Sequence, residues 1–321
     1  GLATIGDMMP LWNFNRSLVI QALKEINEHA FLPLTQLLKN PNDRVDEEVL
    51  SFQLVPKLNA VGRLADQANP NRIVDYLLHQ DSLEIMNLSQ QILKVNENRK
   101  MIHQTMYQKA INLIDSQDAV IMVSDESFHE GVVGITAGQL SNQFKKVALV
   151  MHDDGKRLKG SVRSNGGIHL SELFEPALAY VNRYGGHGAA AGIEIDKDQF
   201  SIFKETVLAN AVNFNQQELL VDTLDFDLLI YSLENIKDIK QYGPFGMDFI
   251  FPPLLFKDVK IQSMKDIKRG QKFSVSIHQK NFDALDFSQS YQNNLQSFYG
   301  KLSVNEYRGV ESLTIFIQNW I

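Results

Sequence analysis

Three short stretches of the chain combine glycines with side chains that can bind an anion. Glycine lets the backbone approach a ligand closely, and arginine, serine and histidine can each donate hydrogen bonds to phosphate oxygens. One glycine-rich turn alone is more often a simple connection between a helix and a strand. Three such stretches, each beside an apolar run, favour a shared anion-binding pocket. They are His129-Glu-Gly-Val-Val-Gly-Ile135, Lys159-Gly-Ser-Val-Arg-Ser164 and Tyr184-Gly-Gly-His-Gly-Ala-Ala-Ala-Gly192.

Local patterns predict how these side chains are presented. Ser161 and Arg163 are two residues apart on one predicted strand, and they therefore share a face. His129 precedes a helix predicted for residues 132–144, whose N-terminus attracts anions. His187 follows two glycines in a predicted turn, and its ring can donate from either nitrogen. All four side chains can then converge on one phosphate.

Further candidates lie upstream of these stretches. Asn59 and Arg63 flank Gly62, and a turn there would let the guanidinium project toward a phosphodiester. The alternative is the end of a helix with a solvated arginine. Asp7 is a lone carboxylate among apolar residues, and on general grounds such an aspartate is more often a cap or turn residue than a metal ligand.

The composition is that of an ordinary globular protein. Of 321 residues, 44% are hydrophobic and 21% are charged, and none is cysteine, which excludes disulfides and cysteine-ligated metals. No long apolar run or signal-like N-terminus is present, which favours a cytoplasmic location without a membrane partner. The net charge of −7 argues against nucleic-acid binding over the whole surface. A local excess of Lys and Arg within residues 145–183 still allows a basic groove.

Hydrophobic periodicity predicts an α/β chain with several lobes. Residues 82–114 predict one helix of about 50 Å, long enough to connect two lobes. A β-α-β pattern over residues 119–151 follows it. The other predicted elements are the end of a buried strand at 1–11, helices at 15–38 and 170–181, a loop at 40–43, strands at 159–163 and 191–195, and a capping box at Asp196-x-x-Gln199.

After residue 215 the pattern changes to short strand-like runs, which predict a small β-barrel of OB type. Its basic and aromatic residues could form a platform for single strands, although aromatic residues in a small barrel usually belong to its core. The platform residues would be Lys265, Lys268, Arg269, Lys272, Phe273, Tyr299 and Tyr307.

In this order, the three stretches resemble the DHH-associated domain of RecJ-type nucleases, members of the DHH phosphoesterase superfamily. Ala3-Thr-Ile-Gly-Asp-Met-Met-Pro-Leu11 with Asn15-Arg16 resembles the last motif of that family's catalytic lobe, and Leu58-Asn-Ala-Val-Gly-Arg63 resembles another signature. Tyr242-Gly-Pro-Phe-Gly246 resembles the start of the family's barrel, although the usual Gly-Asn-Pro is replaced by Met-Asp-Phe, which leaves the role of this motif open. Val304-Asn-Glu-Tyr-Arg-Gly309 resembles the last hairpin of the barrel.

The resemblance implies four segments. They are residues 1–78 as the C-terminal part of the DHH catalytic domain, 79–115 as a connecting helix, 116–215 as the DHH-associated domain, and 216–321 as an OB-like barrel that binds single-stranded nucleic acid. It also implies that the chain, which opens at Gly1, is a fragment whose missing lobe holds the Asp-His-His triplet and most of the metal ligands. We therefore expect the chain alone to be inactive.

By resemblance, the complete protein is a single-stranded-DNA-specific 5′–3′ exonuclease acting in DNA repair and recombination. It would use Mn²⁺ or Mg²⁺ with Asp7 as one ligand, and its partners would be single-stranded DNA, single-strand-binding protein and a RecQ-type helicase. His187 would lie near the scissile phosphate. Residues implied in substrate binding are Asn59, Arg63, His129, Ser161, Arg163, Ser164, Gly185 and Gly186. The alternatives are a phosphodiesterase of short oligonucleotides or cyclic dinucleotides, and a non-catalytic single-strand-binding or replisome module.

Overall fold

The computed structural model describes residues 1–29, 31–165, 168–214, 228–230, 239, 241–252, 254–267, 270–277, 279–287, 291, 296–307 and 310–321. The chain divides into two compact units. One comprises Gly1–His29, Arg44–Ser51 and Thr223–Ile321, and the other comprises Ala30–Asp43 and Phe52–Asp222. Among the described helices, none is both long and apolar enough to span a bilayer.

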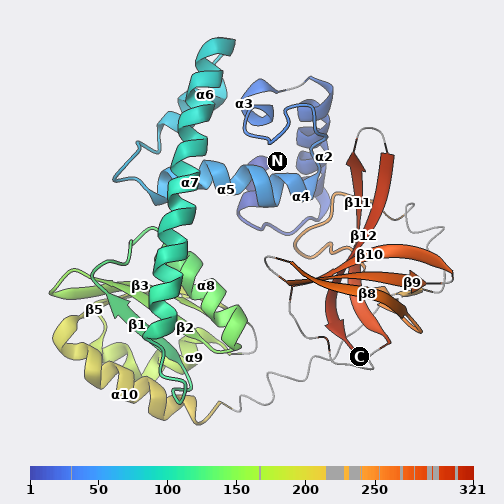
Figure 1. Ribbon diagram of the computed structural model, residues 1–321. Helices are drawn as coiled ribbons and strands as arrows, with labels where there is room; N and C mark the ends of the chain where they lie inside the picture. Colours follow the sequence, from blue (N-terminus) through green and yellow to red (C-terminus); the bar gives the residue numbers. More distant parts are fainter. Residues whose placement is uncertain are drawn as a thin grey trace. The chain divides into compact units, whose positions relative to one another are not determined.

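The second unit is built around the predicted long helix, which is present as α7 (Ser82–Asn112). Its 31 residues span about 47 Å at the rise of an α-helix. Asp81 caps it by accepting a hydrogen bond from the backbone N–H of Glu84 at 2.9 Å. One stretch of α7 packs against α5 (Val55–Arg63), and its C-terminal end packs against a β-sheet (Figure 1). The helix therefore fixes α5 and the sheet relative to each other. Two shorter helices, α3 (Leu32–Thr35) and α6 (Arg72–Leu78), also contact α7.

The sheet has five strands in the order β1-β2-β3-β5-β4. The predicted β-α-β pattern is confirmed, because β1 and β2 pair in parallel and α8 connects them. The remaining pairs are antiparallel. α7 and α8 share one apolar core with β1 and β2, while α9 and α10 contribute to a separate core. The bounds are β1 (Ile121–Asp125), α8 (Val133–Phe144), β2 (Ala148–Asp153), β3 (Arg157–Arg163), α9 (Leu170–Phe174), β4 (Arg183–His187), β5 (Ala190–Asp196) and α10 (Phe200–Ala211).

Three local predictions in this unit are wrong. The helix predicted for 170–181 stops as an α-helix at Phe174 and continues as a 3₁₀ turn (Glu175–Tyr180), because Pro176 cannot donate a backbone hydrogen bond. Asp196 makes no capping bond, since its side chain bonds to Asn182 instead. The two glycines before His187 belong to strand β4, and the turn lies after it, where Gly188 adopts a left-handed φ of 57°.

A salt bridge ties the end of β1 to α7. Lys109 Nζ donates to Asp125 Oδ1 at 2.7 Å, and Ser127 donates to the same oxygen from its backbone N–H at 2.8 Å and its hydroxyl at 2.6 Å. Burial disfavours the carboxylate charge, but these hydrogen bonds outweigh it and lower the pKa of Asp125 to about 2.

This bridge should make the stability of the fold depend on pH in acid. The folded-state pKa lies below the ordinary value of 3.8, so the stabilisation is complete above about pH 4 and is lost as the pH falls toward 2. We expect Asp125→Asn to lower the free energy of unfolding by about 2 kcal/mol at neutral pH and to flatten the acid dependence below pH ~4. Urea unfolding of the wild-type chain and of Asp125→Asn, from about pH 2 to pH 7, would measure the free energy of unfolding of each. Parallel pH profiles would contradict the assignment.

The helical part of the first unit begins with α1 (Leu2–Gly6) and α2 (Asn13–Glu28). The strand predicted for residues 1–11 is therefore wrong, because a short apolar run does not distinguish a strand from a helical segment. The backbone N–H of Asp7 donates to Ala3 O at 2.8 Å and ends α1. Helix α4 (Glu47–Val49) follows α3 along the chain, and a π-helical turn (Leu50–Leu54) then leads into α5.

The structure shows what the motif at residues 242–246 contacts. The Arg16 guanidinium donates to Pro244 O at 2.6 Å, to Gly243 O at 3.1 Å and to Tyr242 O, and it lies 4.1 Å from the centre of the Phe249 ring. Met247 O also accepts a hydrogen bond from the backbone of Leu11 at 2.8 Å. The motif therefore anchors the start of the barrel on the segment that follows Asp7.

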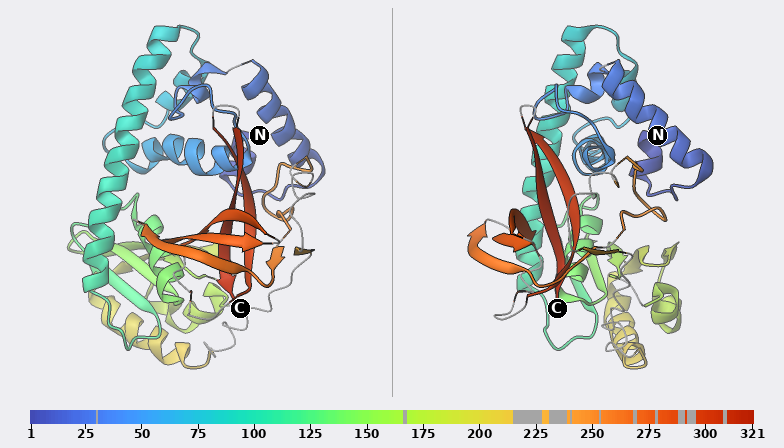
Figure 2. Two further views of the ribbon diagram at one scale, coloured as in Figure 1. Left: turned by 45° about the vertical axis from the view of Figure 1, so that its right-hand side comes forward. Right: turned by 90° about the vertical axis from the view of Figure 1, so that its right-hand side faces the viewer.

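The barrel of the first unit is a seven-stranded sheet with the order β6-β7-β11-β12-β10-β9-β8. Strands β7 and β8 lie near opposite ends of this order but are joined by only residues 257–259, so the sheet curls back on itself. β11 and β12 form a long ribbon, drawn in red in Figure 2. This confirms the OB-type architecture. The bounds are β6 (Leu228–Ile230), β7 (Leu254–Phe256), β8 (Lys260–Ile267), β9 (Gly270–Ile277), β10 (Lys280–Asp286), β11 (Phe298–Tyr307) and β12 (Val310–Trp320).

The proposed aromatic platform on the barrel does not form as predicted. Phe273 belongs to the buried core of the barrel, and Tyr299 is buried as well, so neither ring is displayed on the surface. Lys272 is paired with Asp283 at 2.7 Å. Lys268, Arg269 and the side chain of Tyr307 lie outside the described residues.

Candidate anion-binding site

The second unit contains a cavity of about 630 Å³ between α5, the start of α8 and β3. Four residues predicted from the sequence line it: Asn59 and Arg63 from α5, and Ser161 and Arg163 from β3. Its remaining lining comes from Leu58, Gly62, Pro70, Ile73, Glu130, Gly131, Val133, Gly134 and Gly160.

Ser161 and Arg163 share one face of β3, as predicted, while Val162 between them is fully buried in the core. Arg163 Nη1 donates to Ser161 Oγ at 2.6 Å and to Val162 O at 2.7 Å. Ser161 Oγ lies 3.3 Å from Ala191 O, to which it can donate. Burial, and then the charge of Arg63, lower the pKa of Arg163. Strand β3 thus presents the Arg163 guanidinium to the cavity, and the groups that accept these hydrogen bonds are neutral.

Arg63 is the last residue of α5, so the turn predicted around Gly62 is absent and the alternative of a helix end holds. Its Nη1 donates to Gly131 O at 3.2 Å, and burial lowers its pKa. Neither Arg63 nor Arg163 forms an ion pair with a carboxylate among the described residues. Two cationic groups therefore face the same cavity, and no described carboxylate is paired with either of them.

Two glycines of the 129–135 stretch allow the cavity walls to meet. A Cβ on Gly131 would lie 1.8 Å from the carbonyl oxygen of Arg63, so only glycine permits this contact. A Cβ on Gly134 would lie 3.0 Å from Arg163 Nη2 and 3.2 Å from Ser161 Oγ. The 129–135 stretch thus contacts both the end of α5 and strand β3 at positions where glycine leaves room for them.

A third arginine, Arg99 of α7, was not among the predicted site residues. Its Nη2 donates to Asn96 Oδ1 at 2.8 Å, and its buried Nε has no hydrogen-bond partner among the described residues. Burial, and then the charge of Arg63, lower its pKa, against a smaller opposing effect of Glu97. The sequence signal was the polar interruption of the apolar helix at residues 96–99, which is equally compatible with a patch that faces the cleft and with one that faces solvent.

His129 does not line the cavity. Its Nδ1 accepts a hydrogen bond from the backbone N–H of Gly131 at 3.1 Å, which leaves Nε2 to donate to Asp66 Oδ1 at 3.1 Å. Both ring nitrogens are therefore occupied by the segments that carry Arg63 and Gly131. A direct contact between His129 and phosphate stays a prediction.

The remaining predicted residues of this unit lie on or beside the hairpin formed by β4 and β5. The backbone N–H of Ser164 donates to Ala189 O at 2.9 Å. A Cβ on Gly186 would lie 2.3 Å from Ala190 O, whereas one on Gly185 would meet no atom within 4 Å. His187 pairs in register with Ala190, but its side chain lies outside the described part of the structure.

Asp7 belongs to the first unit, where it is exposed at the end of α1. Within the described ranges, no three His, Asp or Glu side chains gather in a way that could hold a metal ion. Asp7 by itself therefore does not make a metal site, and no chemical step through a metal follows from these residues.

The chain was compared with known protein families, with curated proteins and with solved structures. Residues 116–213 match the DHHA1 domain, and residues 224–319 match the RecJ OB domain. The single-stranded-DNA-specific exonuclease RecJ of Bacillus subtilis (strain 168) is 27% identical over 99% of the chain and 43% of its own length. The protein of the same name from Thermus thermophilus is 31% identical over 79% of the chain and 38% of its own length.

Crystal structures of RecJ from Thermus thermophilus in complex with Mg²⁺ and with Mn²⁺ have the same fold as this chain. Their TM-scores are 0.81 and 0.78 at 23% identity, with 99% and 100% of this chain and 51% and 48% of theirs covered. The chain spans about half, or less, of the length of these relatives.

Proposed function

Because the chain belongs to the RecJ family, with a DHHA1 domain and a RecJ OB domain, we propose that it supplies the substrate-binding part of a single-stranded-DNA-specific 5′–3′ exonuclease. The observation that carries the proposal is the cavity in which Arg63 and Arg163 lie beside Ser161 without a carboxylate partner among the described residues. A terminal phosphate supplies the missing negative charge and accepts the hydrogen bonds that both guanidinium groups can donate.

In this proposal, Ser161 and Arg163 hold the 5′ phosphate, and Arg63 with Asn59 holds the opposite side of the same group. Arg99, which is close enough to Arg63 for their charges to interact, adds positive charge near the cavity. His129 acts through Asp66 and Gly131 by fixing the segments that form the cavity wall. Ser164, Gly185 and Gly186 then contact the strand beyond the phosphate.

Catalysis would take place outside this cavity. We propose that His187 lies near the scissile phosphate and that Asp7 is one ligand of a two-metal centre for Mn²⁺ or Mg²⁺, whose other ligands lie beyond the described residues. The chain alone would then bind single strands without hydrolysing them. The RecJ OB match favours this nuclease over a smaller phosphodiesterase. Cytoplasmic location, a role in DNA repair and recombination, and docking to single-strand-binding protein or a helicase remain part of the proposal.

The proposal predicts salt-sensitive binding to single-stranded DNA. If the three arginines each neutralise one phosphate charge, the logarithm of the affinity should fall with the logarithm of salt concentration with a slope of about −2. Fluorescence anisotropy with a 5′-phosphorylated oligothymidylate would measure this, with a duplex of equal length as the control. Salt-independent binding, or equal affinity for the duplex, would contradict the proposed site.

A further inference from the structure

A second cavity, of about 280 Å³, adjoins the cavity of the proposed phosphate site, which is called the first cavity below. Glu130, Val133 and Gly160 line both, so the second cavity continues from the first. Its cationic residues are Lys159 of β3 and Arg183 of β4. The other lining residues are Ile193 and Glu194.

The strand register shows where the second cavity lies relative to the proposed path of the DNA. Lys159 pairs with Glu194, and Glu194 pairs with Arg183, so these three form one row across the sheet. Ser161 lies two residues further along β3 on the same face, about 7 Å away. His187, beside which the scissile phosphate is proposed to lie, is at the other end of β4 from Arg183. The proposed terminal phosphate therefore lies between the second cavity and the scissile phosphate.

A ligand group in the second cavity would thus be attached to the terminal phosphate on the side away from the strand. The terminal phosphate is joined to its nucleoside through the 5′ oxygen, and the strand continues from there toward the scissile bond. Its other oxygens are free of the strand, and one of them can carry a further phosphate. A strand that begins with a nucleoside 5′-diphosphate or 5′-triphosphate has such a group, the β-phosphate.

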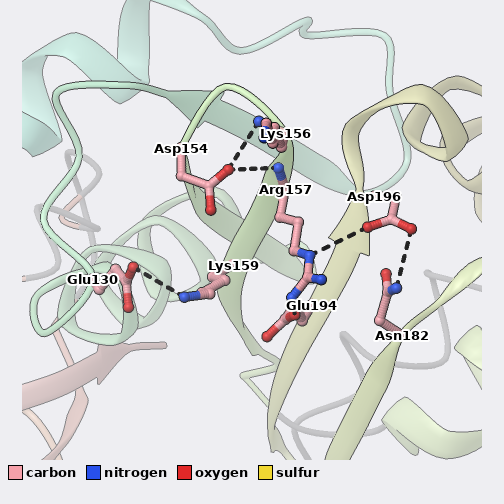
Figure 3. A network of polar contacts seen from close by, with 8 residues as sticks. All are labelled: Glu130, Asp154, Lys156, Arg157, Lys159, Asn182, Glu194 and Asp196. Carbon is pink, nitrogen blue, oxygen red and sulfur yellow. Dashed lines mark hydrogen bonds and ion pairs between the residues drawn. The ribbon is translucent and has the colours of Figure 1, made fainter.

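The charges around the second cavity leave two cations for this group. Arg157, which does not line the cavity, binds Glu194 at 2.8 Å (Figure 3). The carboxylate between Lys159 and Arg183 in the row therefore already has a cationic partner. Among the described residues, the Arg183 side chain has no ion pair or hydrogen bond.

Lys159 is held only loosely. Its Nζ lies 3.6 Å from Glu130 Oε1, which is too long for a hydrogen bond, and both side chains are largely exposed (Figure 3). Such a pair contributes little stability, so exchanging Glu130 for a phosphate costs little.

We propose that the second cavity binds the β-phosphate of a single strand with a 5′ diphosphate or triphosphate, while the first cavity binds the α-phosphate. Lys159 and Arg183 hold the β-phosphate. The inference rests on the proposed function of the first cavity, and it extends the substrate class from monophosphorylated to polyphosphorylated 5′ ends. Because the α-phosphate keeps its place, the scissile phosphate has the same position for both kinds of end.

Two oligothymidylates of equal length, labelled at the 3′ end, test the proposal on the 321-residue chain. One carries a 5′ monophosphate and the other a 5′ diphosphate, so their contacts beyond the terminus are the same. In fluorescence anisotropy with a metal chelator present, the wild-type chain should bind the diphosphate strand about 5- to 30-fold more tightly, as expected for two exposed charge contacts. The double variant Lys159→Ala/Arg183→Ala should lose most of this preference and keep its affinity for the monophosphate strand.

The control is Lys94→Ala/Lys156→Ala, which removes the same charge from exposed positions outside both cavities. It should keep the preference, and both double variants should melt at the temperature of the wild-type chain. Equal binding of the two strands by the wild-type chain, or an unchanged preference in Lys159→Ala/Arg183→Ala, would overturn the second subsite. An equal loss for both strands would also overturn it, because the two side chains would then act elsewhere than at the β-phosphate.

Arg163→Ala distinguishes failure of this inference from failure of the proposed function. If Arg163→Ala weakens binding of both strands but Lys159→Ala/Arg183→Ala leaves the preference unchanged, only the second subsite is wrong. If Arg163→Ala leaves both affinities unchanged, the first phosphate site is wrong, and the inference built on it falls as well.

Discussion

Replacing Arg163 with alanine should weaken binding of 5′-phosphorylated single-stranded DNA by about 10- to 150-fold. That range corresponds to the loss of about 1.5–3 kcal/mol for hydrogen bonds to a charged group. The expectation follows from the contact of Arg163 with Ser161, from the position of Arg163 in the cavity lining and from the absence of a carboxylate partner among the described residues. Binding of strands with a 5′ hydroxyl should change far less, because they lack the group that Arg163 is proposed to hold.

Arg157 provides a matched control on the same strand. It is also an arginine of β3, but it binds Glu194 and Asp196 and does not line the cavity. Arg157→Ala should leave the preference for a 5′ phosphate intact. Arg163→Lys should recover only part of the affinity, since an ammonium group cannot form the bidentate contact of a guanidinium. Equal losses on 5′-phosphorylated and 5′-hydroxyl strands would make Arg163 a general backbone contact.

Gly131→Ala should cause the largest loss of stability of any small change near the cavity. The added Cβ would stand 1.8 Å from the carbonyl oxygen of Arg63, so the loop and α5 must separate. We expect the free energy of unfolding to fall by about 3 kcal/mol, at the upper end of the range for overpacking. Phosphate binding should fall with it, because Arg63 moves with the end of α5. Urea unfolding and titration with thymidine 5′-monophosphate report the two effects separately.

Gly138→Ala is the control for this substitution. Gly138 lies inside α8, and its added Cβ would meet only Arg163 Cγ, at 3.9 Å. Alanine is favoured over glycine within a helix by about 1 kcal/mol, so this variant should be as stable as wild type or more stable. If Gly131→Ala is as stable as Gly138→Ala, then α5 and the 129–135 loop are not in the contact described.

The sequence predicted those parts of the fold that depend on long or repeated patterns. The apolar spacing in residues 82–114 extends over many helical turns, and it matched α7 closely. The alternation of Ser161, Val162 and Arg163 placed two polar groups on one strand face, as observed. Short segments failed, as at residues 1–11, where the apolar run is too brief to distinguish a helix from a strand.

The sequence predicted a site residue only where the motif around that residue was enough to indicate its role. Arg63 and Arg163 could be chosen as anion ligands from their own motifs, whereas Arg99 could not, because its relevance depends on how α7 packs against α5. His129 was expected to face an anion, but its ring bonds to Asp66, a partner that no spacing rule connects to it. The pairing of Gly185 with Gly192 depends on the register between β4 and β5, which the sequence does not specify.

Arg63, Arg99 and Arg163 also affect how the stability of the fold depends on the anions in the buffer. Arg63 raises the electrostatic cost of charge on both Arg99 and Arg163, so the ligand-free fold contains a repulsion that an anion relieves. An anion that binds the folded chain more tightly than the unfolded chain shifts the folding equilibrium by mass action. If phosphate binds at the proposed site, a phosphate buffer stabilises the folded chain, and the melting temperature measured in it should exceed that measured in a buffer whose anion does not bind.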